Sequence, residues 1–133
     1  MTHPSGDDLL RAPLLAGLSS DERSALAEYF DVEEYDTGRP LVSEGRAGYA
    51  FFILDQGQAT VTQDGRELRV LGPGDFFGEI AIIGEGRRTA TVTAREPVVV
   101  WALFGSEFRQ LESTHPDVAA ALQQAMHERL ASG

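Results

Sequence analysis

Hydrophobic and polar residues alternate differently in three regions of the chain. Near the N-terminus, Ser19 with Glu22 three residues later forms a capping box, and apolar residues then follow at helical spacing. This pattern predicts a helix over about residues 20–30. The residues before it are punctuated by proline and glycine, so they predict only a short helical turn and a loop.

From about residue 32 to 104 the chain consists of short runs of β-forming residues separated by turn residues. Small or apolar residues alternate with polar ones over residues 59–71, on both sides of Asp64 and Gly65, and this is the pattern of a β-hairpin. Several short strands at this spacing are typical of a β-sandwich or β-roll.

Helical spacing returns after Trp101. It predicts a short helix over about residues 106–111 and a longer one over about residues 116–130, which Pro116 can begin. The predicted fold is therefore mainly β with flanking helices, one before the β region and two after it. A chain of 133 residues has the length of one domain, which we expect to cover residues 1–133.

Composition and charge limit the classes of function. The chain has no long apolar run and no secretory signal, so we expect a cytoplasmic protein without membrane insertion. It has no cysteine, which excludes disulfides and thiolate chemistry. The net charge is -10, and such a field repels a polyanion, so no direct binding to nucleic acid is expected.

Residues 75–94 carry the candidate chemistry. A buried phosphodiester monoanion needs a fixed guanidinium that donates two parallel hydrogen bonds, and Arg88 is the candidate for this role. Thr89 and Ala90 are small enough to leave room for a ligand, and the Thr89 hydroxyl can add a donor. A small anion can therefore bind here in spite of the negative net charge.

A second group of candidates lies ten residues earlier. The Glu79 carboxylate can accept a hydrogen bond from a ribose hydroxyl, and Gly78 allows the backbone to approach closely. If Ile80 and Ala81 open a short helical turn, their backbone N–H groups point at the phosphate. The predicted site contains no catalytic residue and no metal ligand, and its ligand-binding residues are Gly78, Glu79, Ile80, Ala81, Arg88, Thr89 and Ala90.

These residues resemble the phosphate-binding cassette of the cyclic nucleotide-binding domain family. In that family a Gly-Glu pair precedes a variable turn and then an arginine, a small residue and alanine. A second family pattern, LVSEGRAGYAFFILDQG, covers residues 41–57 and departs from the usual residue type at Arg46. The resemblance extends over roughly residues 14–130.

The resemblance implies a double-stranded β-helix, that is, a jelly-roll-like β-roll. It also implies a regulatory domain that binds cAMP or cGMP, needs no other cofactor and catalyses no reaction. The last helices resemble those of bacterial cyclic AMP receptor proteins, and their movement would signal to an effector protein or to an effector domain missing from this sequence. The resemblance also allows a homodimer.

Other interpretations stay open at this stage. A domain of the same fold that has lost nucleotide binding would serve as an interaction surface, with Arg88 solvated on a strand and Glu79 capping a turn. A β-roll of the cupin class would hold a metal through inward imidazoles, but His3, His115 and His127 all lie outside the predicted barrel. An enzyme is the least favoured interpretation.

The base of the nucleotide is expected to be poorly enclosed, because the last helix ends about where the family's base contacts begin. Affinity would then depend on the phosphate and ribose, which cAMP and cGMP share. The two ligands would differ by only about tenfold, or about 1.4 kcal/mol.

Arg88→Ala is expected to weaken cyclic-nucleotide binding by about thirtyfold or more, because truncating one member of a desolvated charge pair costs roughly 2–5 kcal/mol. Arg87→Ala is expected to change binding by less than about threefold, because successive strand side chains point to opposite faces. Titration of both variants in one buffer, with circular dichroism to confirm folding, measures the difference. A larger loss in Arg87→Ala would mean that the assumed strand register is off by one.

Overall fold

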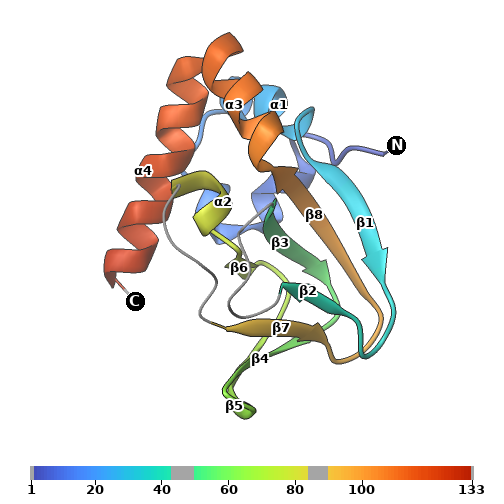
Figure 1. Ribbon diagram of the computed structural model, residues 1–133. Coiled ribbons are helices and arrows are strands. Elements are labelled where there is room, and N and C mark those ends of the chain that lie inside the picture. The colour runs from blue at the N-terminus through green and yellow to red at the C-terminus, as the bar shows by residue number, and fades with distance from the viewer. Residues whose placement is uncertain (1, 43–49, 84–89, 133) are drawn as a thin grey trace.

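Two antiparallel sheets, each of four strands, form the centre of the computed structural model, which describes residues 2–42, 50–83 and 90–132 (Figure 1). The first sheet has the strand order β1-β8-β3-β6, and the second has the order β2-β7-β4-β5. This arrangement confirms the predicted β-roll. The strands are β1 (Asp31–Tyr35), β2 (Pro40–Val42), β3 (Ala50–Gln56), β4 (Ala59–Gln63), β5 (Arg66–Leu71), β6 (Phe76–Phe77), β7 (Thr91–Ala94) and β8 (Val98–Phe104).

Helices pack against the outer face of the first sheet (Figure 1). The predicted capping box is present at the start of α1, where Ser19 Oγ accepts from the Glu22 N–H at 3.1 Å and Glu22 Oε1 accepts from the Ser19 N–H at 2.8 Å. The helices are the 3-10 helices η1 (Asp8–Arg11) and η2 (Pro13–Leu15), and the α-helices α1 (Ser20–Ala27), α2 (Ile80–Ile83), α3 (Gly105–Thr114) and α4 (Pro116–Ser132).

The helix boundaries differ from the predicted ones mainly at α1 and α3. Helix α1 ends at Ala27, earlier than predicted, and the turn that follows buries Phe30 beside Phe51, with ring centroids 6.4 Å apart. Helix α3 continues to Thr114, and both C-terminal helices are confirmed. Within the described ranges, no helix combines the length and apolarity that crossing a bilayer requires.

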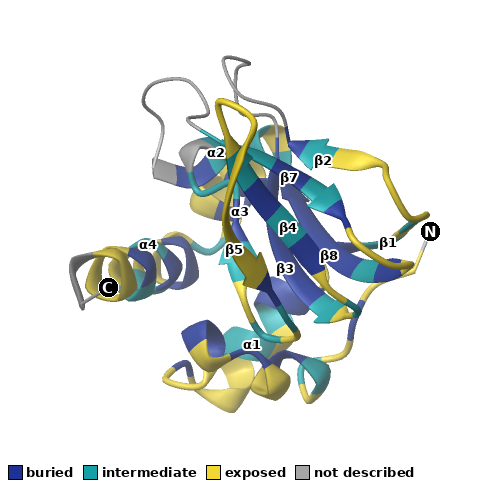
Figure 2. Cartoon of the chain, turned by 90° about the horizontal axis from the view of Figure 1, so that it is seen from below, coloured by how far each residue is buried: buried dark blue, intermediate teal, exposed yellow. Residues whose placement is uncertain are grey.

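The two central strands of the first sheet, β3 and β8, are buried on both faces. In β3, Phe51 and Ile53 belong to the core beneath the helices, whereas Phe52 and Leu54 belong to the core inside the roll. Strand β8 divides its side chains in the same way. Because successive strand residues point to opposite faces, a strand covered on both sides needs a continuous apolar run, and β3 has one (Figure 2).

The β4–β5 hairpin contains a bulge that changes which side chains face inward. Asp64 and Gly65 both have positive φ, 52° and 78°, as a two-residue type I′ turn requires. After two paired positions β5 gains the extra residue Leu68, so that Val61 pairs with Arg69. Paired residues share a face, and Val61 is buried, so Arg69 lies on the inner face of the roll.

Two glycines at turn positions provide a matched test of the packing. Gly57 and Gly38 both have φ of +87°, but a Cβ on Gly57 would lie 2.5 Å from the Pro97 carbonyl oxygen, whereas a Cβ on Gly38 would meet nothing within 4 Å. Gly38→Ala is expected to lower the free energy of unfolding by about 1–2 kcal/mol through backbone strain. Gly57→Ala is expected to lower the free energy of unfolding by about 1–3 kcal/mol more than Gly38→Ala does, because its Cβ overpacks the turn. Urea unfolding measures both, and equal losses would contradict the described β3–β4 turn.

Candidate functional site

A cavity of about 520 Å³ opens between the second sheet, the segment after β5 and the end of α4. Its floor is apolar and comes mainly from the second sheet, while its polar groups come from the turn before β6, from the residues after β6, from β5 and from α4. The described residues that line it are Val42, Val61, Leu68, Arg69, Leu71, Asp75, Phe76, Phe77, Gly78, Glu79, Ala90, Val92, Arg129 and Leu130.

Gly78 and Glu79 reach the cavity because of the sharp turn between β6 and α2. Strand β6 is held by pairing with β3, and Gly78 then adopts φ of 77°, a left-handed conformation that favours glycine. Helix α2 begins directly after Glu79. Ala90 lies across the cavity at the start of β7, so the two ends of the predicted cassette face one cavity.

The predicted helical turn at Ile80 and Ala81 is present as the first two residues of α2. The Ala81 N–H already donates to the Gly78 carbonyl at 3.2 Å. A phosphate contact from this N–H would therefore have to share or replace that hydrogen bond. Ala81 is not among the described residues that line the cavity, whereas Gly78 is.

The remaining predicted ligand residues, Arg88 and Thr89, lie outside the described residues, as do Arg87 and Arg46. The roles assigned to them stay predictions. The sequence places Asp75 in a Pro-Gly-Asp turn and so predicts a structural role for it. This role is confirmed, because its Oδ2 accepts from the Gly72 N–H at 2.8 Å, and Asp75 lines the cavity as well.

The sequence favours a core position over base stacking for the aromatic residues Phe51, Phe52, Phe76, Phe77 and Trp101, and most of them are buried. Phe51, Phe52, Phe77 and Trp101 are all at most 5% exposed. Phe76 is half-buried, packs against Phe51 with ring centroids 5.7 Å apart, and also lines the cavity. One aromatic ring of the predicted core is therefore available to a ligand.

The lining residues that were not predicted as site residues include Leu68 and Arg69 from β5, and Arg129 and Leu130 from α4. Neither guanidinium takes part in a hydrogen bond or ion pair found among the described residues. Helix α4 continues to Ser132, and its Arg129 and Leu130 line the cavity. The expected poor enclosure of the base stays a prediction.

The donor set of the site suits an organic anion better than a metal ion. Arginine side chains and backbone N–H groups donate hydrogen bonds, whereas a metal site needs several converging histidine, cysteine or carboxylate ligands. Among the residues that the structure describes, no group of three or more such ligands could hold a metal ion.

Comparison with known proteins connects this chain to one family. The sequence pattern of the family "Cyclic nucleotide-binding domain" matches residues 32–115. The chain is 40% identical over 120 residues to cGMP-dependent protein kinase egl-4 of Caenorhabditis elegans, which covers 82% of this chain and 15% of the kinase. It is 38% identical over 113 residues to the cAMP-dependent protein kinase regulatory subunit of Debaryomyces hansenii, which covers 84% of this chain and 25% of the subunit.

A solved structure resembles the chain over nearly all of both proteins. The N-terminal domain of a transcriptional regulator from Streptomyces coelicolor A3(2) has a TM-score of 0.80 and 32% sequence identity, covering 95% of this chain and 94% of that one. In contrast, the chain spans only 15% and 25% of the length of the two curated relatives.

Gly78 can be tested against a glycine of the same conformation far from the cavity. Gly78 and Gly65 have φ of 77° and 78°. An alanine at either position is expected to lower the free energy of unfolding by about 1–2 kcal/mol through backbone strain. Only Gly78→Ala is also expected to weaken cyclic-nucleotide binding, by about tenfold or more, because its Cβ would enter the closest approach of ligand to backbone.

Calorimetric titration of the two folded variants measures this difference. A Gly78→Ala variant that binds as tightly as Gly65→Ala would place the ligand elsewhere.

Proposed function

The chain belongs to the cyclic nucleotide-binding domain family, and from this premise we propose that its cavity binds a cyclic purine nucleotide, with cGMP preferred over cAMP. The observation that carries the proposal is that the Gly-Glu pair of the cassette and an inward-facing arginine of β5 line one cavity. The domain acts as a regulatory sensor and not as an enzyme.

The sugar-phosphate part of the ligand lies along the cassette. Glu79 accepts hydrogen bonds from the ribose hydroxyl, and Gly78 lets the backbone approach the ligand. Arg88 pairs with the phosphate through two parallel hydrogen bonds, supported by the Thr89 hydroxyl, while Ala90 leaves space across the cavity. Part of this assignment comes from the family pattern, because Arg88 and Thr89 lie outside the described residues.

The base lies toward β5 and the end of α4. Leu68 and Leu130 are 56% and 45% exposed, and both line the cavity. A purine placed between them would bury apolar surface that is otherwise in contact with water. This contact supports a base site between the hairpin and the helix.

Arg69 supports the preference for cGMP. Guanine presents two adjacent acceptors, O6 and N7, whereas adenine presents one acceptor and an amino group at the same edge. A guanidinium has only donors, so it matches guanine and opposes the adenine amino group. Arg129 adds a second guanidinium to the same cavity and strengthens the preference for cGMP over cAMP.

The ligand site is connected to the C-terminal helices through α2. Gln123 of α4 donates from Nε2 to the carbonyl oxygen of Ile82 at 3.4 Å, and Ile82 is buried in the same core as Leu122. A ligand that repositions α2 would therefore shift α4. We assign the signal to this movement, and its receiver to an effector protein or a further domain of a longer protein.

Arg69→Gln is expected to weaken cGMP binding by about tenfold, because a good bidentate pair with a base contributes about 1–3 kcal/mol. It is expected to change cAMP binding by less than about threefold. Arg66→Gln is the matched control, because Arg66 lies on the same strand but does not line the cavity. Titration of the unaltered chain, Arg69→Gln and Arg66→Gln with both nucleotides gives the ratio of cGMP affinity to cAMP affinity for each protein.

Equal losses for cGMP and cAMP in Arg69→Gln would contradict contact with the base and indicate contact with the shared sugar-phosphate. Absence of binding of either nucleotide to the unaltered chain would instead favour the alternative function, a domain of this fold that serves only as an interaction surface.

A further inference from the structure

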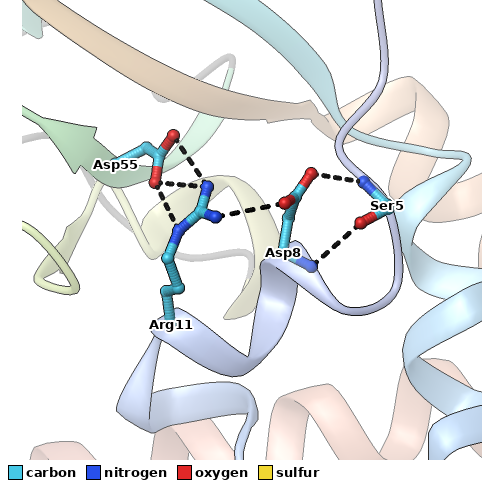
Figure 3. Close-up of polar contacts among 4 residues, drawn as sticks. All are labelled: Ser5, Asp8, Arg11 and Asp55. Carbon is cyan, nitrogen blue, oxygen red and sulfur yellow. Dashed lines mark hydrogen bonds and ion pairs between the residues drawn. The ribbon is translucent and has the colours of Figure 1, made fainter.

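A polar cluster outside the cavity fixes the N-terminal segment to the first sheet. Arg11 of η1 forms a two-pronged ion pair with Asp55 of β3, with Nε to Oδ1 at 3.1 Å, Nη2 to Oδ1 at 2.9 Å and Nη2 to Oδ2 at 3.2 Å (Figure 3). The Asp55 side chain is only 8% exposed. Such a pair forms only over a small range of orientations, because the planar guanidinium and the planar carboxylate must lie edge to edge.

Further contacts leave the Arg11 side chain little freedom. Its Nη1 donates to Asp8 Oδ1 at 3.1 Å (Figure 3). Its guanidinium carbon also lies 5.7 Å from the centre of the Trp101 ring. Asp8 is held in turn by Ser5, whose N–H donates to Asp8 Oδ2 at 2.8 Å. The hydrogen bond to Asp55 also raises the pKa of the Arg11 guanidinium.

The backbone at Arg11 touches the turn that precedes β6. A Cβ placed on Gly74 would lie 3.3 Å from the Arg11 carbonyl oxygen and 3.0 Å from Pro13 Cδ. On its other side this turn is bonded to β3, because the Gly74 N–H donates to the Leu54 carbonyl at 2.7 Å and the Leu54 N–H donates to the Asp75 carbonyl at 2.8 Å. The turn is therefore held between the N-terminal segment and β3.

The same turn leads directly into the ligand cavity. Asp75 lines the cavity, and only the two residues of β6 separate it from Gly78 and Glu79. A strand of two residues has few ladder hydrogen bonds of its own, so its position depends on the contacts at its ends. A displacement of the turn would therefore reach Glu79.

We infer that Arg11 is a positioning residue for the nucleotide cavity: by holding η1 to Asp55 it fixes the turn at residues 72–75 and, through β6, the place of Gly78 and Glu79. The inference rests on the proposed nucleotide binding for its effect on affinity. The claim that Arg11 fixes the position of residues 72–79 does not depend on nucleotide binding, because that position can be measured without ligand.

The experiment compares Arg11→Met with Arg109→Met in the full chain. Arg109 is an exposed arginine of α3 that makes no hydrogen bond or ion pair found among the described residues. Arg11→Met is expected to weaken cGMP binding about fivefold, a size typical of residues that act on a site through others. Arg109→Met is expected to leave the affinity unchanged.

A double variant separates positioning from general stability. In Arg11→Met/Asp55→Leu no buried carboxylate is left unpaired, and replacing such a pair by apolar residues is often neutral for stability. We expect the melting temperature to return toward that of the unaltered chain while the cGMP affinity stays weak. Recovery of affinity together with stability would overturn the inference.

Hydrogen exchange without ligand provides the independent measurement. The amides of residues 72–79 are expected to exchange faster in Arg11→Met than in Arg109→Met, while those of β4 and β7 exchange alike in both. Equal exchange at residues 72–79 would overturn the inference. If the unaltered chain binds neither cGMP nor cAMP, the proposed function fails, and faster exchange at residues 72–79 would still support the positioning role.

Discussion

Burial of β3 and β8, the central strands of the first sheet, on both faces is the constraint on which the rest of the structure depends. Strands β3 and β8 direct one set of side chains into the roll and the other set toward the helices. Removing both sets from water requires the second sheet on one side and the helices on the other. The cavity forms where the second sheet and the helices meet, because β6 leads out of the first sheet into α2, and the end of α4 lines the same cavity as Gly78 and Glu79.

The sequence predicted the parts of the fold that depend on neighbouring residues. The capping box at Ser19 and the turn at Asp64 and Gly65 are local patterns, and both are present. The cassette pattern likewise located Gly78 and Glu79 at the cavity. These positions depend on short-range backbone conformation, which a local pattern records.

The β-bulges in β5 and β3 could not be predicted in this way. A two-residue turn at Asp64 and Gly65 would, without a bulge, pair Val61 with Leu68 and direct Arg69 outward. The bulge restores the burial of Leu71 opposite Ala59 and turns Arg69 inward. The bulge forms because Leu71 must be buried inside the folded roll. The alternation of polar and apolar residues along the chain does not reveal that requirement.

A second bulge places Asp55 outside the regular pairing of β3 with β8, where its carboxylate meets Arg11.

The residues of α4 that line the cavity could not be predicted for a related reason. The sequence indicates a helix that ends near Leu130, but the direction of that helix follows from the packing of Val118, Leu122 and Met126 against the core. Packing direction is a property of the whole fold. Residues near functional cavities are thus the ones that tertiary contacts redirect.

Isothermal titration calorimetry of the full chain with cGMP and with cAMP tests the central claim most directly. The account predicts one nucleotide per chain, with cGMP bound more tightly than cAMP by about tenfold or more. Tighter binding of cAMP would contradict the role given to Arg69 at the base. No heat of binding with either nucleotide at millimolar concentration would contradict the ligand site itself.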